Sequence, residues 1–169
     1  EKETFLALTR DPEVLKKHGV SSPNLEGYLF PDTYHFARGT LPQTVVDTIL
    51  KQFFQKVLPL KDAVEKSGMK LEEVITLASI VERETGRADE RPLIASVFLN
   101  RLKKGMRLDS DPTVIYGIEN FDGDLKKQDL SRETPYNTYV IQGLPPGPIA
   151  NPGLESIRAV LFPAKSEYL

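Results

Sequence analysis

The stretch LASIVERET, residues 77–85, places a glutamate where a helical pattern predicts an apolar side chain. At about 100° of rotation per residue, one apolar stripe of the expected helix holds Leu71, Val74, Ile75, Ala78 and Val81. Glu82 falls inside this stripe, four residues after Ala78 and seven after Ile75. The opposite, polar face holds Glu72, Glu73, Thr76 and Arg83, and Glu84 lies at the border between the faces. The helical pattern therefore singles out Glu82 as the residue that needs an explanation.

A carboxyl group on an apolar helix face suits acid/base catalysis. Desolvation raises the pKa of a buried carboxyl group, in characterised enzymes to about 6. Such a group can donate a proton to a glycosidic oxygen and then accept a proton as its conjugate base. The structural alternative is a buried ion pair between Glu82 and Arg87 or Arg101, or a hydrogen bond from a loop amide to Glu82. The pattern alone leaves both roles open.

Glu26, in the segment LEGYLF, is the best candidate for a second carboxylate. It could orient a sugar, support Glu82 through a hydrogen bond, or cap the turn before Gly27. Asp111, in DSDPT, is expected first of all to cap a short helix, because Pro112 follows it at the first helical position.

The segment YNTY offers aromatic and amide groups, which suit sugar faces and N-acetyl groups. We predict substrate contacts from Tyr136, Asn137 and Tyr139, and from Gln142 just beyond them. The alternative for the tyrosines is packing at the base of the loop with the hydroxyl satisfied there.

The composition excludes several classes of partner and site. The chain mixes 22 basic and 24 acidic residues along its length, so it offers no basic stripe to a nucleic acid. It has no cysteine, and His18 and His35 are not at metal-ligand spacing. Aspartate pairs at 109/111 and 122/124 lack the full spacing of a calcium loop. We expect no metal and no cofactor.

The elements that must position these residues are mostly helices, and we predict a mainly α-helical α+β fold. Start and stop signals predict two short helices within residues 5–19, then helices at 41–57, 61–66, 70–85, 91–104, 112–117 and 154–161. The turn-rich residues 21–40 and the proline-rich residues 136–153 are expected to be ordered loops that contain short strands. No run approaches the ~18 uncharged apolar residues of a membrane span.

Four long motifs carry a resemblance to a known family. They are LEGYLFPDTYHF (25–36), LASIVERET (77–85), VFLNRLKKGMRLDSDPTVIYG (97–117) and YNTYVIQGLPPGPIANPG (136–153). In sequence, order and spacing they closely resemble the YceG-like endolytic murein transglycosylases. By analogy with lysozyme-like enzymes, we expect a catalytic cleft between the Glu82 helix, the DSDPT turn and the proline-rich loop.

The resemblance implies a specific chemistry and cellular setting. It implies that Glu82, which ends ASIVE, is the catalytic acid/base and that Asp111 lines the cleft. The implied reaction cuts the bond between N-acetylmuramic acid and N-acetylglucosamine in peptidoglycan without water, which leaves 1,6-anhydro ends. The implied setting is a single-pass protein of the bacterial cell membrane, with its catalytic domain on the outer, periplasmic or extracellular, side and with penicillin-binding proteins as partners.

The same resemblance predicts how the chain is divided. We expect residues 1–169 to be the catalytic domain, without the membrane anchor and LysM-like module that precede it in the family and without the segment that follows it. Two alternatives stay open. The chain could be a hydrolase that uses Glu82 with Glu26 or Asp111, or a non-catalytic glycan-binding or assembly module in which Glu82 is a buried structural ion.

Overall fold

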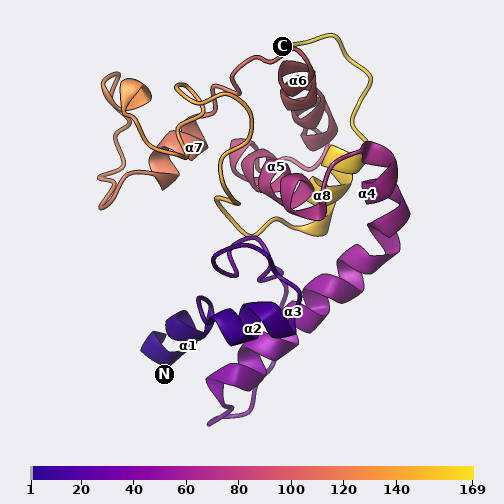
Figure 1. Ribbon diagram of the computed structural model, residues 1–169, viewed down its shortest axis with the longest axis vertical. Coiled ribbons are helices and arrows are strands. Elements are labelled where there is room, and N and C mark those ends of the chain that lie inside the picture. Colours follow the sequence, from indigo (N-terminus) through magenta and orange to yellow (C-terminus); the bar gives the residue numbers. More distant parts are fainter. Residues whose placement is uncertain (1) are drawn as a thin grey trace.

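The computed structural model describes residues 2–169, which form helices joined by long ordered loops (Figure 1). The α-helices are α1 (Lys2–Leu8), α2 (Pro12–Lys17), α3 (Pro42–Val57), α4 (Lys61–Ser67), α5 (Leu71–Glu84), α6 (Arg91–Lys103), α7 (Asp111–Tyr116) and α8 (Leu154–Leu161). Two short 3₁₀ helices, η1 (Leu58–Leu60) and η2 (Asp129–Ser131), were not predicted. Each predicted α-helix is confirmed, with ends that differ by a few residues.

Local signals explain the helix ends. Asp11 caps α2, because its side-chain Oδ1 accepts a hydrogen bond from the Glu13 amide at 2.8 Å and Pro12 occupies the first helical position. Gly68 ends α4 with φ of 73°, a left-handed conformation that glycine adopts without a Cβ penalty. These signals lie within a few residues of the ends they set, so the sequence is enough to find them.

The α+β prediction is wrong, because residues 2–169 contain no β-strand. Asparagine side chains, rather than a neighbouring strand, satisfy main-chain groups of residues 27–29 and 129–132. Asn137 Nδ2 donates to the carbonyl oxygens of residues 129, 130 and 132, at 3.3, 3.1 and 2.8 Å. Asn151 Oδ1 accepts from the amides of Gly27 and Leu29, at 2.8 and 3.0 Å. The four prolines of residues 136–153 also lack the amide that a strand ladder needs.

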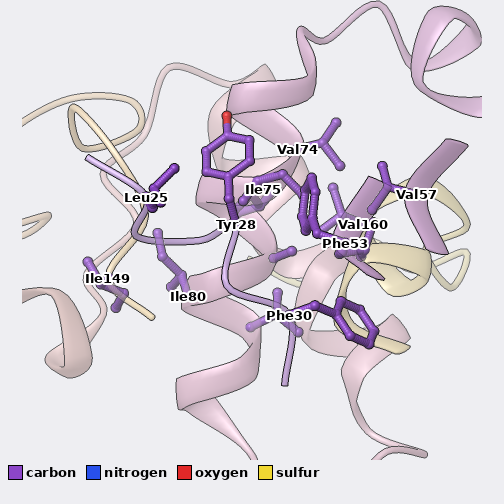
Figure 2. Close-up of a cluster of buried hydrophobic side chains, with 14 of the residues drawn as sticks. Leu25, Tyr28, Phe30, Phe53, Val57, Val74, Ile75, Ile80, Ile149 and Val160 are labelled. Atoms are coloured by element: carbon purple, nitrogen blue, oxygen red, sulfur yellow. The ribbon is translucent and has the colours of Figure 1, made fainter. Parts of the chain in front are cut away.

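Helix α5 lies at the centre of the C-terminal half of the chain and packs against both α6 and α8 (Figure 1). All eight residues from 74 to 81 are buried. Figure 2 shows how this core continues into the N-terminal half, where the ring of Tyr28 lies beside Phe53 of α3 with ring centroids 5.0 Å apart. The loop of residues 25–30 therefore lies between α3 and α5 and joins the two halves of the core.

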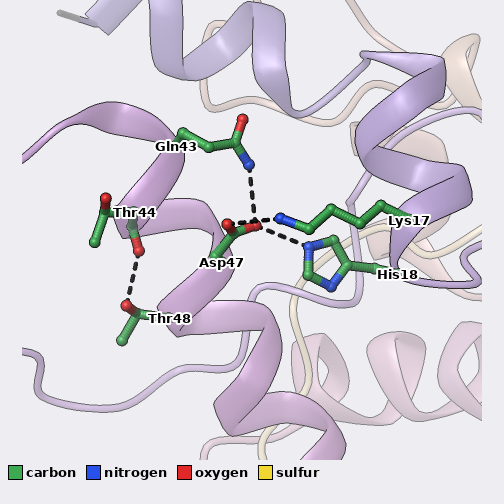
Figure 3. Close-up of polar contacts among 6 residues, drawn as sticks. All are labelled: Lys17, His18, Gln43, Thr44, Asp47 and Thr48. Carbon is green, nitrogen blue, oxygen red and sulfur yellow. Dashed lines mark hydrogen bonds and ion pairs between the residues drawn. The ribbon is translucent and has the colours of Figure 1, made fainter.

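A polar cluster at Asp47 fastens α2 to α3 (Figure 3). Lys17 Nζ donates to Asp47 Oδ2 at 2.9 Å, while His18 Nε2 and Gln43 Nε2 bond to Asp47 Oδ1 at 2.8 and 2.9 Å. The hydrogen bond from Lys17 is the main cause that lowers the pKa of Asp47 to about 2. The ionised carboxylate is therefore the form that the folded chain prefers.

This cluster predicts a pH-dependent contribution to stability. A carboxyl group whose pKa is depressed in the folded state stabilises that state above its unfolded pKa and loses the contribution as pH falls. Because Asp47 is one-third exposed, we expect Asp47→Asn to lower the free energy of unfolding at pH 7 by only about 0.5–1 kcal/mol. The difference between the two proteins should vanish between about pH 4 and pH 2. Urea unfolding at several pH values measures this, and a difference that stays constant down to pH 2 would contradict it.

Candidate active site

The last turn of α5 carries two glutamates, Glu82 and Glu84, which contact different parts of the molecule. The helix enters this turn after eight consecutive buried residues, so no side of it faces water along that stretch. Thr76, which the helical pattern placed on a polar face, is only 4% exposed. The single apolar stripe was therefore a wrong description of α5. Both glutamates lie just beyond this fully buried stretch of the helix.

Glu82 is bound by three donors from two segments. Arg91 Nη2, at the start of α6, lies 3.1 Å from Glu82 Oε1. On the other oxygen, Oε2, the Gly153 amide donates at 3.0 Å and the Ser156 hydroxyl at 2.6 Å. The side chains of Glu82 and Arg91 are 25% and 14% exposed. Glu82 thus joins the C-terminal end of α5 to the beginnings of α6 and α8.

The loop amide expected as a structural partner of Glu82 is that of Gly153. The arginine partner is Arg91, and not Arg87 or Arg101. Arg87 pairs with Asp89 and Glu90, and Arg101 donates to the carbonyl oxygen of Leu108. Arg91 was missed. The signal available was the shortness of the connection between α5 and α6, which returns the first residue of α6 to the end of α5.

Glu84 lies on another side of the α5 terminus, exposed and next to the DSDPT and YNTY segments. Ser110 Oγ donates to Glu84 Oε2 at 3.0 Å, and Tyr139 donates its phenol proton to Asp111 Oδ1 at 2.7 Å. Burial, followed by the hydrogen bond and charge of Asp111 and the charges of Asp109 and Glu84, raises the pKa of Tyr139 to about 12. Two predicted site residues, Asp111 and Tyr139, are thus brought together, and the carboxylate beside them is Glu84.

Glu26 and Tyr136 form a second group. Burial raises the pKa of Glu26, whose Oε1 accepts a long hydrogen bond of 3.4 Å from Asn151 Nδ2. The pKa of Tyr136 is raised by burial and then by the charge of Glu26. Its ring packs against Tyr116, at the end of α7, with centroids 4.7 Å apart. Helix α7 therefore has the Asp111–Tyr139 pair at its first residue and the Tyr116–Tyr136 pair at its last.

Asn137 and Gln142 are not brought to these groups as substrate contacts. Asn137 is fully buried, and its amide binds loop carbonyls. Gln142 Nε2 donates to the Gly105 carbonyl oxygen at 2.9 Å. An open cavity of about 780 Å³ lies at the other end of α5, beside Glu72, Glu73 and Thr76, and none of the predicted site residues lines it. The structure therefore does not show the predicted lysozyme-like cleft.

The chemistry available at this surface is that of carboxylates, phenols and hydroxyls. Within residues 2–169, no three side chains of histidine, cysteine, aspartate or glutamate are arranged to hold a metal ion. Proton transfer by a glutamate is the reaction that these groups support directly.

A family model, two curated proteins and a crystal structure similar to this chain all point to one protein family. Residues 2–169 match the model of the YceG-like family. A protein of Bacillus subtilis (strain 168) named endolytic murein transglycosylase is 42% identical over 86% of this chain, and a Streptococcus pneumoniae protein (serotype 2, strain D39) of the same name is 32% identical over 99% of it. The matched regions are 41% and 32% of those two proteins, so the chain spans less than half of their length. A crystal structure of a yceG-like protein from Listeria monocytogenes superimposes with a TM-score of 0.89 at 36% identity, covering 99% of this chain and 60% of that one.

Gly27, next to Glu26, lies where the loop of residues 21–40 packs closely against the proline-rich loop and α5. Gly27 has φ of +90°, and a Cβ there would lie 2.5 Å from Pro148 Cγ and 2.8 Å from Ile75 Cγ2. We expect Gly27→Ala to lower the free energy of unfolding by about 2–4 kcal/mol, through backbone strain and overpacking together.

Gly39 provides the matched control for this prediction. It has a similar φ of +86°, but nothing lies within 4 Å of its Cβ position. Gly39→Ala should therefore cost only the backbone strain, about 1–2 kcal/mol. Equal losses in the two variants, measured by urea unfolding, would mean that the close approach of Pro148 and Ile75 contributes nothing.

Proposed function

This chain belongs to the YceG-like family, and from that premise we propose that it cuts the glycan strands of peptidoglycan internally. The observation that carries the proposal is its 42% identity, over 86% of its length, to a protein named endolytic murein transglycosylase. We also propose that residues 1–169 are the catalytic domain of that activity.

The proposed reaction is a lytic transglycosylation that needs one carboxyl group and no water. The acid donates its proton to the glycosidic oxygen, and the bond from that oxygen to the anomeric carbon of N-acetylmuramic acid breaks. The resulting carboxylate then removes the proton of the 6-hydroxyl of the same sugar, whose oxygen bonds to the anomeric carbon. The carboxyl group regains its proton, and the product is a 1,6-anhydro end. One group serves both steps, because the first proton transfer creates the base for the second.

We propose Glu84 rather than Glu82 as this acid/base. Substrate must reach the reacting oxygen, and Glu84 is exposed, with a single side-chain partner, Ser110, among the residues described. Its neighbours Asp111 and Tyr139 supply polar groups for sugar hydroxyls and acetamides. The oxygens of Glu82, in contrast, are engaged by Arg91, Gly153 and Ser156.

Glu82 is the second candidate, because the family resemblance selects it and its side chain is 25% exposed. In our proposal Glu82 has the structural role of fixing the starts of α6 and α8 against α5. The substrate contacts that remain proposed are those of Asp111, Tyr139, Tyr136 and Glu26. The buried Asn137 supports the loop that carries the two tyrosines.

The cellular setting is a coarser proposal. Action on the bacterial cell wall follows from the proposed substrate, and we propose that it takes place on the outer side of the cell membrane with penicillin-binding proteins nearby. No helix within residues 2–169 is long and apolar enough to cross a membrane.

The test of the function is the product. We expect the protein to release muropeptides with anhydro-muramic ends from purified peptidoglycan, as identified by mass spectrometry. Glu84→Gln should lower the rate about 10²- to 10⁴-fold, because glutamine can neither donate nor accept the proton. Its free energy of unfolding should change by less than about 0.5 kcal/mol, since the side chain is exposed. Reducing ends in place of anhydro ends would mean hydrolysis and would refute the proposed reaction.

The variant Glu82→Gln tests which of the two glutamates is the acid/base. The partly buried Arg91 would lose its charged partner, and its buried Nε already has no partner among the described residues. We expect the free energy of unfolding to fall by about 1–3 kcal/mol, with most of the activity retained in the folded protein. A variant as stable as the wild type that releases no anhydro products would instead identify Glu82 as the acid/base.

A further inference from the structure

Thr138 holds the first turn of α7 and the two residues before it at three points. The Asp109 amide donates to the Thr138 carbonyl oxygen at 3.2 Å. The Ser110 amide donates to Thr138 Oγ1 at 3.0 Å, and the Thr138 amide donates to Thr113 Oγ1 at 3.2 Å. Ser110, Thr113 and Thr138 are at most 1% exposed. Three buried hydroxyl residues from two distant motifs therefore form one closed group.

The number of protons fixes the direction of the threonine hydroxyls. Thr113 Oγ1 donates to the Ser110 carbonyl oxygen at 2.6 Å, and a hydroxyl has a single proton to donate. In the 2.8 Å contact between the two threonine hydroxyls, Thr138 must therefore be the donor. Thr113 Oγ1 then accepts from both the amide and the hydroxyl of Thr138, which uses its two lone pairs. Neither threonine hydroxyl has a proton left for another partner.

The backbone of Ser110 is held by the two threonines, and neither of them uses its hydroxyl. Its amide donates to Thr138 and its carbonyl oxygen accepts from Thr113. The hydroxyl proton is the donor that remains, and it is directed to Glu84 Oε2 at 3.0 Å. Ser110 thus presents one donor to Glu84 from a buried and fixed position.

We propose that Ser110 is the positioning residue of Glu84, and that Thr113 and Thr138 fix the direction from which it donates. The proposal rests on the proposed function, because it gives Ser110 a role in the acid/base step. Ser110 occupies one carboxyl oxygen of Glu84, which leaves Oε1 to carry the proton to the glycosidic oxygen and to receive it from the 6-hydroxyl. A fixed carboxyl group avoids the loss of rate that comes from a misplaced catalytic group.

The first test compares kcat and KM for the release of anhydro ends from uncrosslinked glycan strands. We expect Ser110→Ala to lower kcat about 10- to 100-fold, because Glu84 is no longer held. KM should stay within about twofold, since the contacts to bound substrate are unchanged. Ser110→Thr keeps the hydroxyl and should restore most of kcat. Ser96→Ala is the matched control and should leave kcat unchanged. Ser96 is a buried serine in α6, and among the residues described its hydroxyl bonds only to the Leu93 carbonyl oxygen and the Ser166 hydroxyl.

The second test does not need activity. In crystal structures we expect the Glu84 side chain to adopt one rotamer in the wild type and several in Ser110→Ala. Thr138→Val, which keeps the shape but removes the hydroxyl, should also disorder Glu84, whereas Thr138→Ser should not.

Two results would overturn the inference: a Ser110→Ala protein with wild-type kcat, or one in which Glu84 keeps a single rotamer. A wild-type protein that releases no anhydro ends would instead refute the proposed function, and the crystal structures would still decide whether Ser110 positions Glu84.

Discussion

Complete burial of the middle of α5 is the constraint on which the rest of the structure depends. A helix with no side open to water must be covered on every side, and here α6, α8, α7 and the two long loops supply the cover. A buried hydroxyl in this stretch needs hydrogen-bond partners inside the protein. Ser79, for example, donates to the Thr76 carbonyl oxygen at 2.7 Å and accepts from the Ile149 amide at 3.0 Å. The proline-rich loop is thereby fixed against the centre of the domain.

The two loops also show how a backbone can be ordered without strands. Asn137 and Asn151 each satisfy several main-chain groups with one side chain, and neither residue is exposed. Such loops have defined positions, which a site made from loop residues needs. Hydrogen bonds within the loop arrange the polar groups at the end of α5. The buried Thr138 and Asn137 bind the backbone amides of Ser110 and Tyr139, and the Tyr139 hydroxyl binds Asp111.

The sequence was sufficient for the helices and insufficient for the choice between the two glutamates. Helix boundaries follow from caps such as Asp11 and Gly68, which act within a few residues. The helical wheel, however, assumes one buried and one exposed face, and that assumption fails for a helix covered on all sides. Thr76 and Ser79 look polar in the sequence and are buried in the fold. The contacts that distinguish Glu82 from Glu84 come from residues 91, 110, 153 and 156. The short connection between α5 and α6 is a local signal for residue 91, but no local pattern reports the position of the other three. The strands were predicted because an extended, aromatic-rich loop and an edge strand have the same composition.

The hydrogen bonds from Gly27 and Leu29 to Asn151 span 124 and 122 positions of the chain. Closing a chain segment of this length carries an entropic cost that these contacts must offset. During synthesis, residues 25–31 must wait until more than a hundred further residues have been made before their partner exists. The surface around Glu26 is therefore assembled only once nearly all of the chain is available. A nascent chain that ends just after α5 carries both glutamates, but it lacks residues 91, 110, 153 and 156, whose contacts make the two glutamates different.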